Sequence, residues 1–282
     1  MQVFKHIHEL RSQISVQKVR GKKVGLVPTM GALHRGHLEL VSAARRENDV
    51  VVASIFVNPT QFNNPEDLKK YPRSLETDLQ LLEAENCDFV FVPEENEIYP
   101  EEPLTKIQFG YLNSIMEGAH RPGHFDGVGL VVGKLFNIVQ PDRAYFGKKD
   151  LQQLTIIKKM VHDLNFDIEI IPYPIVREKD GLAMSSRNAR LNDEERKEAP
   201  AIYRNLELIS ERLSKQETSF EAAKKSFIEE VDRHSTLCTE YIEVVDTKTL
   251  RPVENLGEGK NVSICVAVFA GNIRLIDNVS II

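Results

Sequence analysis

Short apolar runs alternate with amphipathic segments through the first two-thirds of the 282-residue chain. The apolar runs are rich in valine, isoleucine and phenylalanine without regular polar alternation, which is typical of parallel strands buried on both faces. We expect such strands at 24–28, 49–57, 87–93, 143–147 and 167–172. Between them, apolar residues recur at three- and four-residue steps, which predicts helices at about 37–47, 74–85, 129–139 and 150–164. This order of elements predicts a doubly wound, Rossmann-like parallel sheet.

Beyond Val176 the pattern changes to a polar stretch, REKDGLAMSSRNARLNDEERKEAP, which is typical of a linker or an exposed loop. After it, apolar residues three and four apart predict one amphipathic helix, with Asp193 and Glu194 near its start and Ala199, Ile202, Leu206, Ile209 and Leu213 along one face. We expect a second helix over about 219–234 and strands at 241–246, 262–270 and 273–278. The sequence therefore predicts two domains, a Rossmann-like one over 1–176 and a smaller α+β one over 177–282 with a helix pair and an antiparallel sheet.

Composition narrows the class of ligand. The chain has 36 basic and 42 acidic residues and a net charge of −6, which gives no electrostatic footprint for nucleic acid or an anionic membrane. Small-molecule substrates are therefore expected. The three cysteines are far apart and suggest neither a disulfide framework nor a CxxC metal site. The first residues, MQVFKHIHELRSQIS, contain no continuous apolar core of a signal peptide, so we expect a cytoplasmic protein.

The first candidate site follows the strand at 24–28, where the chain continues as PTMGALHRGH. In an open parallel sheet, ligands bind beyond the carboxyl ends of the strands, where loops lead into helix N-termini. Gly31 and Gly36 let the backbone pass close to a ligand, and a helix start favours phosphate. His34 and His37 are suited to hydrogen-bonding phosphate oxygens and stabilising a departing pyrophosphate. Taken alone, such a pair is equally typical of polar loop residues, and neither GxGxxG nor a P-loop occurs here.

The second candidate site, GKKDLQQ at 147–153, directly follows the strand at 143–147. Lys149 is suited to neutralising phosphate and Asp150 to accepting hydrogen bonds from ribose hydroxyls. In the alternative interpretation, Asp150 only caps the next helix and the lysines are solvated. Gln153 lies one turn into that helix, where it can face the same ligand.

The third candidate site, GLAMSSRNAR at 181–190, contains Ser185, Ser186 and Arg187. Hydroxyls and a guanidinium group are good phosphate ligands, and a mobile loop can close over a triphosphate. On its own, the segment is more typical of a polar linker.

Two further polar stretches are candidates for lining a site. The stretch 58–78 follows the strand at 49–57, and its Gln61 and asparagines suit a small hydroxy acid or amino acid. The stretch 117–129, EGAHRPGHFDGVG, places glycines around Arg121, His124 and Asp126 and is too long and polar for a plain turn. No GxSxG elbow and no carboxylate pair placed for glycosidase chemistry occurs in the sequence.

Four segments, PTMGALHRGH, RPGHFDGV, PDRAYFGKKDLQQ and DGLAMSSRN, occur in this order between residues 20 and 190. Together they resemble the pantothenate synthetase, or pantoate–β-alanine ligase, family. The HxGH and MSSR elements also resemble the signature motifs of the nucleotidyltransferase superfamily that includes class I aminoacyl-tRNA synthetases. The C-terminal third carries no motif that extends the resemblance.

The resemblance implies a two-step ligation that depends on ATP and Mg²⁺, in a homodimer. The carboxylate of (R)-pantoate attacks the α-phosphate of ATP to give pantoyl adenylate and pyrophosphate, and the amine of β-alanine then displaces AMP to give pantothenate, the coenzyme A precursor. In the family His37 is the proton donor, although we expect electrostatic stabilisation of pyrophosphate to be the larger part of its role.

The resemblance also assigns residues to ligands. It assigns ATP binding to Met30, Gly31, Ala32, Leu33, His34, Arg35, Gly36, His37, Gly147, Lys148, Lys149, Asp150, Val176, Met184, Ser185, Ser186 and Arg187. Among these, it implies catalytic roles for His37, His34, Lys149, Ser185, Ser186 and Arg187. It assigns pantoate to Gln61 and Gln153, with Gln61 also near β-alanine, and makes Asp78 a possible neighbour of Mg²⁺. Lys148 departs from the glutamate that is common in the family.

Two other classes of function remain open at this point. A nucleotidyltransferase would stop after transferring AMP or CMP to its substrate and would leave a stable nucleotidylated product. A nucleotide-sensing or RNA-binding relative of the synthetases would have lost catalysis. The acidic net charge and the presence of both histidines and the Ser-Ser-Arg segment disfavour this second alternative.

Overall fold

The computed structural model describes residues 1–253, 255–257 and 261–281. Its contacts divide the chain into two compact units: unit 1 comprises Met1–Lys148 and Ile156–Pro174, and unit 2 comprises Lys149–Thr155 and Ile175–Ile282. The division into domains at 176/177 concerns parts that fold independently, and it stays a prediction. Among the described residues, no helix combines the length and apolar character needed to cross a membrane.

Unit 1 is built on a six-stranded sheet whose neighbouring strands are all parallel, in the order β1-β4-β3-β2-β5-β6. The strands are β1 (Gln2–Phe4), β2 (Val24–Thr29), β3 (Val50–Ile55), β4 (Phe89–Phe91), β5 (Arg143–Gly147) and β6 (Glu169–Tyr173). Every residue of β3 is buried, as its unbroken apolar run predicts. The predicted doubly wound sheet is confirmed.

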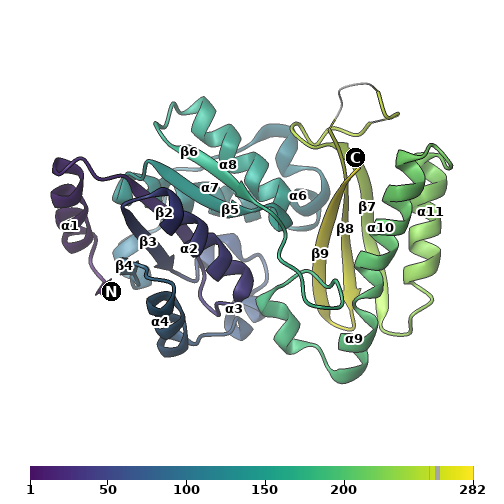
Figure 1. Cartoon of the computed structure of the whole chain (residues 1–282), viewed down its shortest axis with the longest axis horizontal. Helices are drawn as coiled ribbons and strands as arrows, with labels where there is room; N and C mark the ends of the chain where they lie inside the picture. The colour runs from purple at the N-terminus through teal and green to yellow at the C-terminus, as the bar shows by residue number, and fades with distance from the viewer. Residues whose placement is uncertain (254, 258–260, 282) are drawn as a thin grey trace. The chain divides into compact units, whose positions relative to one another are not determined.

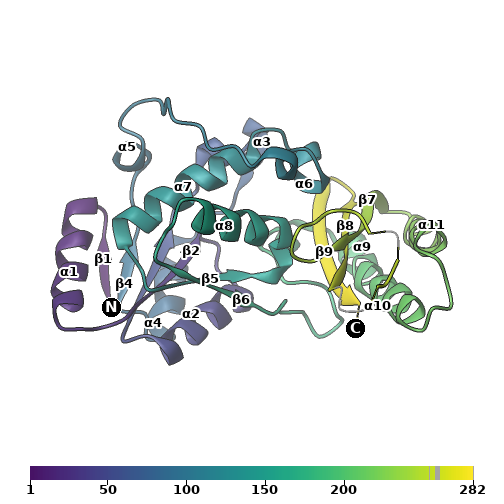
Figure 2. The same ribbon diagram turned by 90° about the horizontal axis from the view of Figure 1, so that it is seen from above.

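Helices cover both faces of this sheet. In Figures 1 and 2, α2 and α4 lie on one face and α7 and α8 on the other, while α1 packs against α7. The helices of this part of the chain are α1 (Ile7–Val19), α2 (Arg35–Glu47), α3 (Pro65–Lys70), α4 (Leu75–Ala84), α5 (Glu95–Ile98), α6 (Met116–His120), α7 (His124–Val139) and α8 (Leu151–Asp163). Short 3₁₀ helices are η1 (Pro59–Gln61), η2 (Gly110–Asn113) and η3 (Lys148–Asp150).

The two edges of the parallel sheet carry different chemistry. At the amino edge, Asp49, Asp88 and Asp142 each directly precede a strand and accept a backbone N–H, from Lys23, Val51 and Val24 at 2.9, 2.7 and 2.7 Å. These carboxylates satisfy donors that lie near the strand starts. The carboxyl edge instead leads into the segments with glycine, histidine and lysine that the sequence singled out.

Unit 2 contains a three-stranded antiparallel sheet in the order β7-β8-β9, with α10 packed against β9 and α11 against β7 (Figure 1). Its elements are η4 (Ser186–Arg190), α9 (Asp193–Glu198), α10 (Ala201–Ser214), α11 (Phe220–Val231), β7 (Leu237–Asp246), β8 (Val262–Ala270) and β9 (Ile273–Ile281). The apolar face of α10 meets the sheet in one core, which includes Leu206, Phe227 and Ile264. The predicted helix pair and small antiparallel sheet are confirmed.

Two predictions about residues 177–213 are wrong. The polar stretch is not a linker or an exposed loop, because it contains η4, α9, an isolated bridge between Arg177 and Ala183, and the buried Leu182. The single predicted amphipathic helix is two helices, α9 and α10, which are separated at Ala199 and Pro200. Proline has no N–H to donate to a preceding turn, so the chain starts a new helix there.

The elements that were not predicted from the sequence include the short β1, α3, α5 and α6 and the longer helix α1. The helix α1 buries only Leu10 and Ile14, so its apolar pattern is weak. The helix α7 begins at His124, inside the polar stretch 117–129, and not at 129.

Candidate active site

The order of strands in unit 1 defines where a ligand is expected. From β2 the chain proceeds through β3 to β4 on one side, and it then returns to β5 on the other side of β2. Loops leaving β2 and β5 at their carboxyl ends therefore diverge, and such a topological switch point is where open α/β sheets bind ligands. Met30 directly follows β2 and Lys148 directly follows β5.

The loop between β2 and α2 is built around one buried carboxylate, that of Asp78. Asp78 lies in the first turn of α4 and is 1% exposed. Its Oδ2 accepts the backbone N–H of Ala32 at 2.9 Å, and its Oδ1 accepts that of Leu33 at 2.8 Å and the hydroxyl of Ser74 at 3.2 Å. The predicted neighbourhood of Asp78 to Mg²⁺ stays a prediction, and these contacts give the residue a definite structural role as well.

The same loop has an unusual backbone. Gly31 has φ +80°, and a Cβ atom there would lie 3.0 Å from Asp78 Oδ2 and 3.0 Å from a methyl group of Ile55. Ala32 also lies in the left-handed region, at φ 49°, which is uncommon for a residue with a side chain. Asp78 therefore holds the loop in a conformation that Gly31 permits and Ala32 disfavours.

His34 and His37 cap the start of α2 and thereby fix their own tautomers. The N–H of Gly36 donates to His34 Nδ1 at 3.1 Å, and the N–H of His34 donates to His37 Nδ1 at 3.4 Å. The two rings lie side by side with centroids 4.0 Å apart. A neutral imidazole whose Nδ1 accepts a hydrogen bond carries its proton on Nε2. Both histidines are thus N–H donors at Nε2, and the predicted position of His37 in the first helical turn is confirmed.

Gln61 is buried and its amide is held in one orientation by Asn58. The hydroxyl groups of Tyr99 and Thr60 donate to Asn58 Oδ1 at 2.9 and 3.0 Å. Asn58 Nδ2 donates to the carbonyl of Gly127 at 3.2 Å and to Gln61 Oε1 at 3.1 Å. Burial raises the pKa of Tyr99, so its hydroxyl stays protonated and remains a donor.

These contacts orient the side-chain amide of Gln61, so that its NH₂ group points away from Asn58. Because the carbonyl of Gly127 can only accept, the atom of Asn58 facing it must be Nδ2. Gln61 therefore turns Oε1 toward Asn58 and Nε2 toward Met30, whose sulfur lies 3.0 Å away. An amide N–H is suited to a carboxylate or hydroxyl of a small acid. His124, from the stretch 117–129, binds the carbonyl of Gln61 through Nδ1 at 2.8 Å.

The segment after β5 divides between the two units. Gly147 ends the strand in unit 1, and Lys148 beside it is exposed. Lys158 has a lowered pKa because of burial and, secondarily, the charge of Lys148. In unit 2, Lys149 is half-buried and its carbonyl accepts from Asn278 Nδ2 at 3.0 Å. The other two predicted residues of this segment are Asp150, which is exposed, and Gln153, which is half-buried in α8.

The remaining predicted residues lie on a hairpin and a 3₁₀ helix of unit 2. The N–H of Met184 donates to the carbonyl of Val176 at 3.0 Å, so these two residues face each other across the hairpin. Ser185 caps η4 by accepting the N–H of Arg187 at 3.2 Å, and Ser186 begins that helix. All five of these residues are half-buried, whereas Arg35 of the first segment is exposed and pairs with Glu39.

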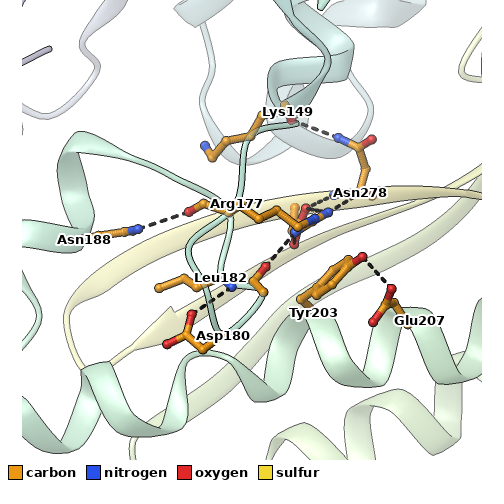
Figure 3. A network of polar contacts seen from close by, with 11 residues as sticks. Lys149, Arg177, Asp180, Leu182, Asn188, Tyr203, Glu207 and Asn278 are labelled. Carbon is orange, nitrogen blue, oxygen red and sulfur yellow. Dashed lines mark hydrogen bonds and ion pairs between the residues drawn. The ribbon is translucent and has the colours of Figure 1, made fainter. Parts of the chain in front are cut away.

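Within each unit the structure brings several predicted residues together. In unit 1, Gln61 contacts Met30 and Asp78 holds Ala32 and Leu33. In unit 2, one polar network joins Lys149 to the hairpin that carries Val176 and Met184 (Figure 3). The sequence did not single out three residues of these networks, namely Arg177, Asp277 and Asn278, whereas Asn58 was among the asparagines of the stretch 58–78. The available signal for Asp277 and Asn278 was a polar pair inside an otherwise apolar strand, IRLIDNVSI.

The fold and the site together define a class of protein. A doubly wound sheet with an HxGH segment starting the helix after a central strand, and a Ser-Ser-Arg segment further along the chain, is the arrangement expected of an α/β enzyme that handles nucleotide phosphates.

Comparisons with known proteins make the assignment specific. A family model described as pantoate–β-alanine ligase matches residues 2–280. Pantothenate synthetase of Thermosipho melanesiensis is 53% identical over 280 residues, which cover 99% of each chain, and that of Aquifex aeolicus is 50% identical, covering 98% and 97%. This chain belongs to the pantoate–β-alanine ligase family. It is a ligase that condenses pantoate with β-alanine at the expense of ATP.

Solved structures agree with this membership. The crystal structure of pantothenate synthetase from Thermus thermophilus matches with a TM-score of 0.92 and 45% identity, covering 99% of both chains. Pantoate–β-alanine ligase from Francisella tularensis, complexed with βγ-ATP and β-alanine, matches with a TM-score of 0.84 and 36% identity, covering 99% of this chain and 97% of that one.

Proposed function

We propose that the ligation proceeds through a pantoyl adenylate. A carboxylate oxygen of (R)-pantoate attacks the α-phosphorus of ATP, the bond to the β-phosphate oxygen breaks, and pyrophosphate leaves. The β-alanine amine then attacks the acyl carbon, the bond to AMP breaks, and the amine loses a proton, giving pantothenate. The Francisella tularensis ligase, whose complex contains a form of ATP and β-alanine, supports a site that admits both kinds of molecule.

The observation that carries this proposal is the pair of Nε2 donors that the cap of α2 creates on His34 and His37. Pyrophosphate gains negative charge as it leaves, and prearranged N–H donors beside a helix N-terminus stabilise such charge. The loop backbone contributes less, because Asp78 already accepts the N–H groups of Ala32 and Leu33. We propose that the two histidine side chains bind the phosphates of ATP at the start of α2. Met30 to Leu33, Arg35 and Gly36 form the wall of the site there.

The remaining ATP contacts are proposed for unit 2. Lys149 neutralises phosphate, Asp150 accepts from ribose, and Val176 contacts adenine. The segment Met184 to Arg187 binds the triphosphate with a hydroxyl and a guanidinium group. The glutamines bind pantoate, and the donor end of Gln61 suits its carboxylate or hydroxyls and the carboxylate of β-alanine.

Magnesium is proposed to enter as a complex with ATP. Among the described residues, no group of three or more His, Cys, Asp or Glu side chains could hold a metal ion. Mg²⁺ commonly keeps water ligands and binds substrate phosphates with few protein carboxylates, so phosphate oxygens fit this chain better than a protein cage does. Asp78 is the proposed neighbour of the ion.

Further parts of the proposal rest on the sequence and the family. We propose a cytoplasmic homodimer with a nucleotide- and pantoate-binding domain at 1–176 and a second domain at 177–282. Cys87, Cys238 and Cys265 form no disulfide among the described residues, which is compatible with a reducing compartment. Sedimentation velocity of the purified chain tests the dimer.

The decisive experiment measures two reactions while leaving out one component at a time. AMP release from ATP and Mg²⁺ should require both pantoate and β-alanine, whereas exchange of labelled pyrophosphate into ATP should require pantoate alone. Exchange that needs β-alanine would contradict the adenylate. AMP release indifferent to β-alanine would contradict the ligase and favour a nucleotidyltransferase.

A further inference from the structure

Two consecutive residues of β9, Asp277 and Asn278, hold two separate segments of unit 2. Asn278 and its contact with Lys149 are labelled in Figure 3. They are 5% and 7% exposed, and they lie in an edge strand of the small sheet. Successive side chains of a strand leave opposite faces, so a pair of neighbours can reach two different segments. An aspartate and an asparagine are also uncommon in an otherwise apolar strand, and their burial calls for specific partners.

Asp277 binds Arg177 in a bidentate ion pair. Its Oδ2 accepts from Arg177 Nη1 at 2.7 Å and its Oδ1 accepts from Nη2 at 3.0 Å, while the N–H of Asn278 donates to Oδ1 at 2.7 Å. The carboxylate is almost completely enclosed, with 4% of the side chain exposed. Burial raises the pKa of Asp277 and the guanidinium opposes that rise, so the carboxylate depends on Arg177 for its charge.

Arg177 in turn fixes the hairpin to which it belongs. Its Nη1 donates to the carbonyl of Gly181 at 3.1 Å, and its guanidinium carbon lies 3.5 Å from the centre of the Tyr203 ring. Gly181 has φ +93°, and a Cβ there would lie 2.5 Å from Tyr203 Cδ1. The turn of the hairpin is therefore pressed against the ring on which Arg177 stacks.

This hairpin carries two predicted ATP contacts at facing positions. Arg177 forms an isolated bridge with Ala183, and the N–H of Met184 donates to the carbonyl of Val176. Val176 precedes Arg177 directly, and Met184 follows Ala183 directly. Fixing Arg177 therefore fixes both neighbours, and Asn188 Nδ2 extends the connection by donating to the carbonyl of Ala183 at 3.1 Å.

Asn278 reaches the other predicted segment. Its Nδ2 donates to the carbonyl of Lys149 at 3.0 Å, and its own carbonyl accepts from Arg177 Nη2 at 3.4 Å. Lys149 and the hairpin belong to the same compact unit but lie far apart in sequence. One short piece of β9 thus touches both.

We propose that Asp277 and Asn278 are positioning residues that hold the Lys149 segment and the Val176–Met184 hairpin in the arrangement that binds ATP. This inference rests on the proposed ATP-binding role of those segments. A buried ion pair is weak evidence for stability, because apolar residues of similar volume often stabilise a core equally well. A bidentate pair instead fits a positioning role, because the planar guanidinium of Arg177 fixes the orientation of the two side chains as well as the distance between them.

The same strand supplies a matched control. Arg274 of β9 binds Glu240 of β7 with its Nε 3.0 Å from Oε2, and each side chain of that pair is 18% exposed. Neither residue belongs to the segments assigned to ATP. Breaking this pair perturbs the same sheet without touching Lys149 or the hairpin.

The test compares Asp277→Asn, Asn278→Ala and Glu240→Gln in the full chain. Calorimetry measures the Kd of the non-hydrolysable analogue α,β-methylene-ATP with Mg²⁺, and kinetics give kcat and the KM of ATP and β-alanine. We expect both β9 variants to raise the Kd and the KM of ATP about tenfold, the order of one weakened hydrogen bond to a charged group, and to leave the KM of β-alanine unchanged. Glu240→Gln should lower Tm and leave all three ligand constants as they are.

Three results would overturn the inference. They are a folded Asp277→Asn variant with wild-type affinity for the analogue, an equal rise in Kd for Glu240→Gln, and a parallel rise in the KM of β-alanine. If Asp277→Asn does not fold, Asn278→Ala decides, because it keeps the ion pair and removes only the amide. Pyrophosphate exchange that needs β-alanine would refute the proposed adenylate, and the binding comparison would still test the two positioning residues.

Discussion

Two segments proposed to bind ATP, the loop Met30–His37 and the hairpin Val176–Met184, are each fixed by a buried aspartate from elsewhere in the chain, but in opposite ways. Asp78 accepts backbone N–H groups of its loop, whereas Asp277 accepts from a charged side chain of its hairpin. We call these two aspartates anchors. The first anchor, Asp78, occupies backbone donors that a phosphate would otherwise bind, and the second anchor, Asp277, does not. This difference is the reason for assigning phosphate binding at the first segment to histidine side chains and a helix start.

The anchors also differ in how far they reach. Asp78 lies 46 residues from Ala32, and Asp277 lies 100 residues from Arg177. Asp78 accepts from neutral backbone donors, whereas Asp277 needs a cation to compensate for its burial. The five predictions below separate the two anchors and the groups that each one positions.

The largest effect is expected for Asp78→Asn. The amide keeps one acceptor but places an NH₂ group against the N–H of Ala32 or of Leu33, so a buried donor loses its partner and the loop relaxes. We expect kcat/KM to fall about a hundredfold, which corresponds to roughly 2.7 kcal/mol. The measurement is steady-state kinetics with Glu76→Gln as control, because Glu76 is exposed in the same first turn of α4.

The Mg²⁺ dependence of the Asp78→Asn variant sharpens its meaning. If Asp78 mainly shapes the loop, raising Mg²⁺ does not restore activity. Restoration of activity by excess Mg²⁺ would instead show that Asp78 acts mainly through the ion.

The next largest effect is expected for His37→Ala, which removes one of the two Nε2 donors. Turnover should fall at least about tenfold, or roughly 1.4 kcal/mol of transition-state stabilisation. Single-turnover formation of the adenylate from ATP and pantoate is the measurement, since the loss belongs to the first step. Near-normal turnover would show that His37 only completes the helix cap.

Asn58→Asp tests the oriented amide of Gln61. A carboxylate cannot donate to Gln61 Oε1 or to the carbonyl of Gly127, so Gln61 should turn its NH₂ toward residue 58 and present its oxygen to the substrate. We expect the KM values of pantoate and β-alanine to rise about tenfold, as for a lost hydrogen bond to a charged group, and the KM of ATP to stay unchanged. Tyr99→Phe removes one of two donors to Asn58 and should show a smaller change in the same direction. A rise in the KM of ATP alone would contradict the assignment.

His34→Asn separates capping from ligand binding at the start of α2. Asparagine is a good N-cap, so the helix start keeps its partner for the N–H of Gly36, but the imidazole Nε2 donor is lost. We expect unchanged Tm and a rise of about fivefold in the KM of ATP, equivalent to one ordinary hydrogen bond. His34→Ala, which loses both roles, should in addition destabilise the chain by about 1 kcal/mol. Equal KM values for wild type and His34→Asn would leave His34 only a capping role.

The contrast between the anchors also accounts for what the sequence could predict. The parallel strands can be predicted from their unbroken apolar runs, and His34 and His37 lie in one contiguous segment next to such a run. Their tautomers could not be predicted from the sequence. They depend on the geometry of the helix cap, although the backbone contacts involved span no more than three residues.

The anchors themselves could not be predicted. Arg177 looked like part of a linker because its partner is 100 residues away, and the partner of Asn278 is 129 residues away. Arg177 is half-buried by pairing across the fold, which no local pattern of the sequence expresses. Pro200, by contrast, was visible in the sequence, and the apolar periodicity on both sides of it outweighed its effect on the predicted helix.

The last prediction separates the two anchors directly by thiol labelling and does not depend on an activity measurement. Cys87 packs in the core of unit 1 together with Leu82 of α4, and Cys265 lies opposite Asn278 in the ladder between β8 and β9. Burial raises the pKa of Cys87 to about 12, so at pH 8 only about one such thiol in ten thousand is ionised and reactive.

With the exposed Cys238 replaced by serine, both thiols should label slowly. Asp78→Asn should accelerate labelling of Cys87 alone and Asp277→Asn that of Cys265 alone, because local opening exposes only the neighbouring core. Equal acceleration of both thiols by either variant would mean that the two aspartates stabilise one cooperative fold and do not act as separate anchors.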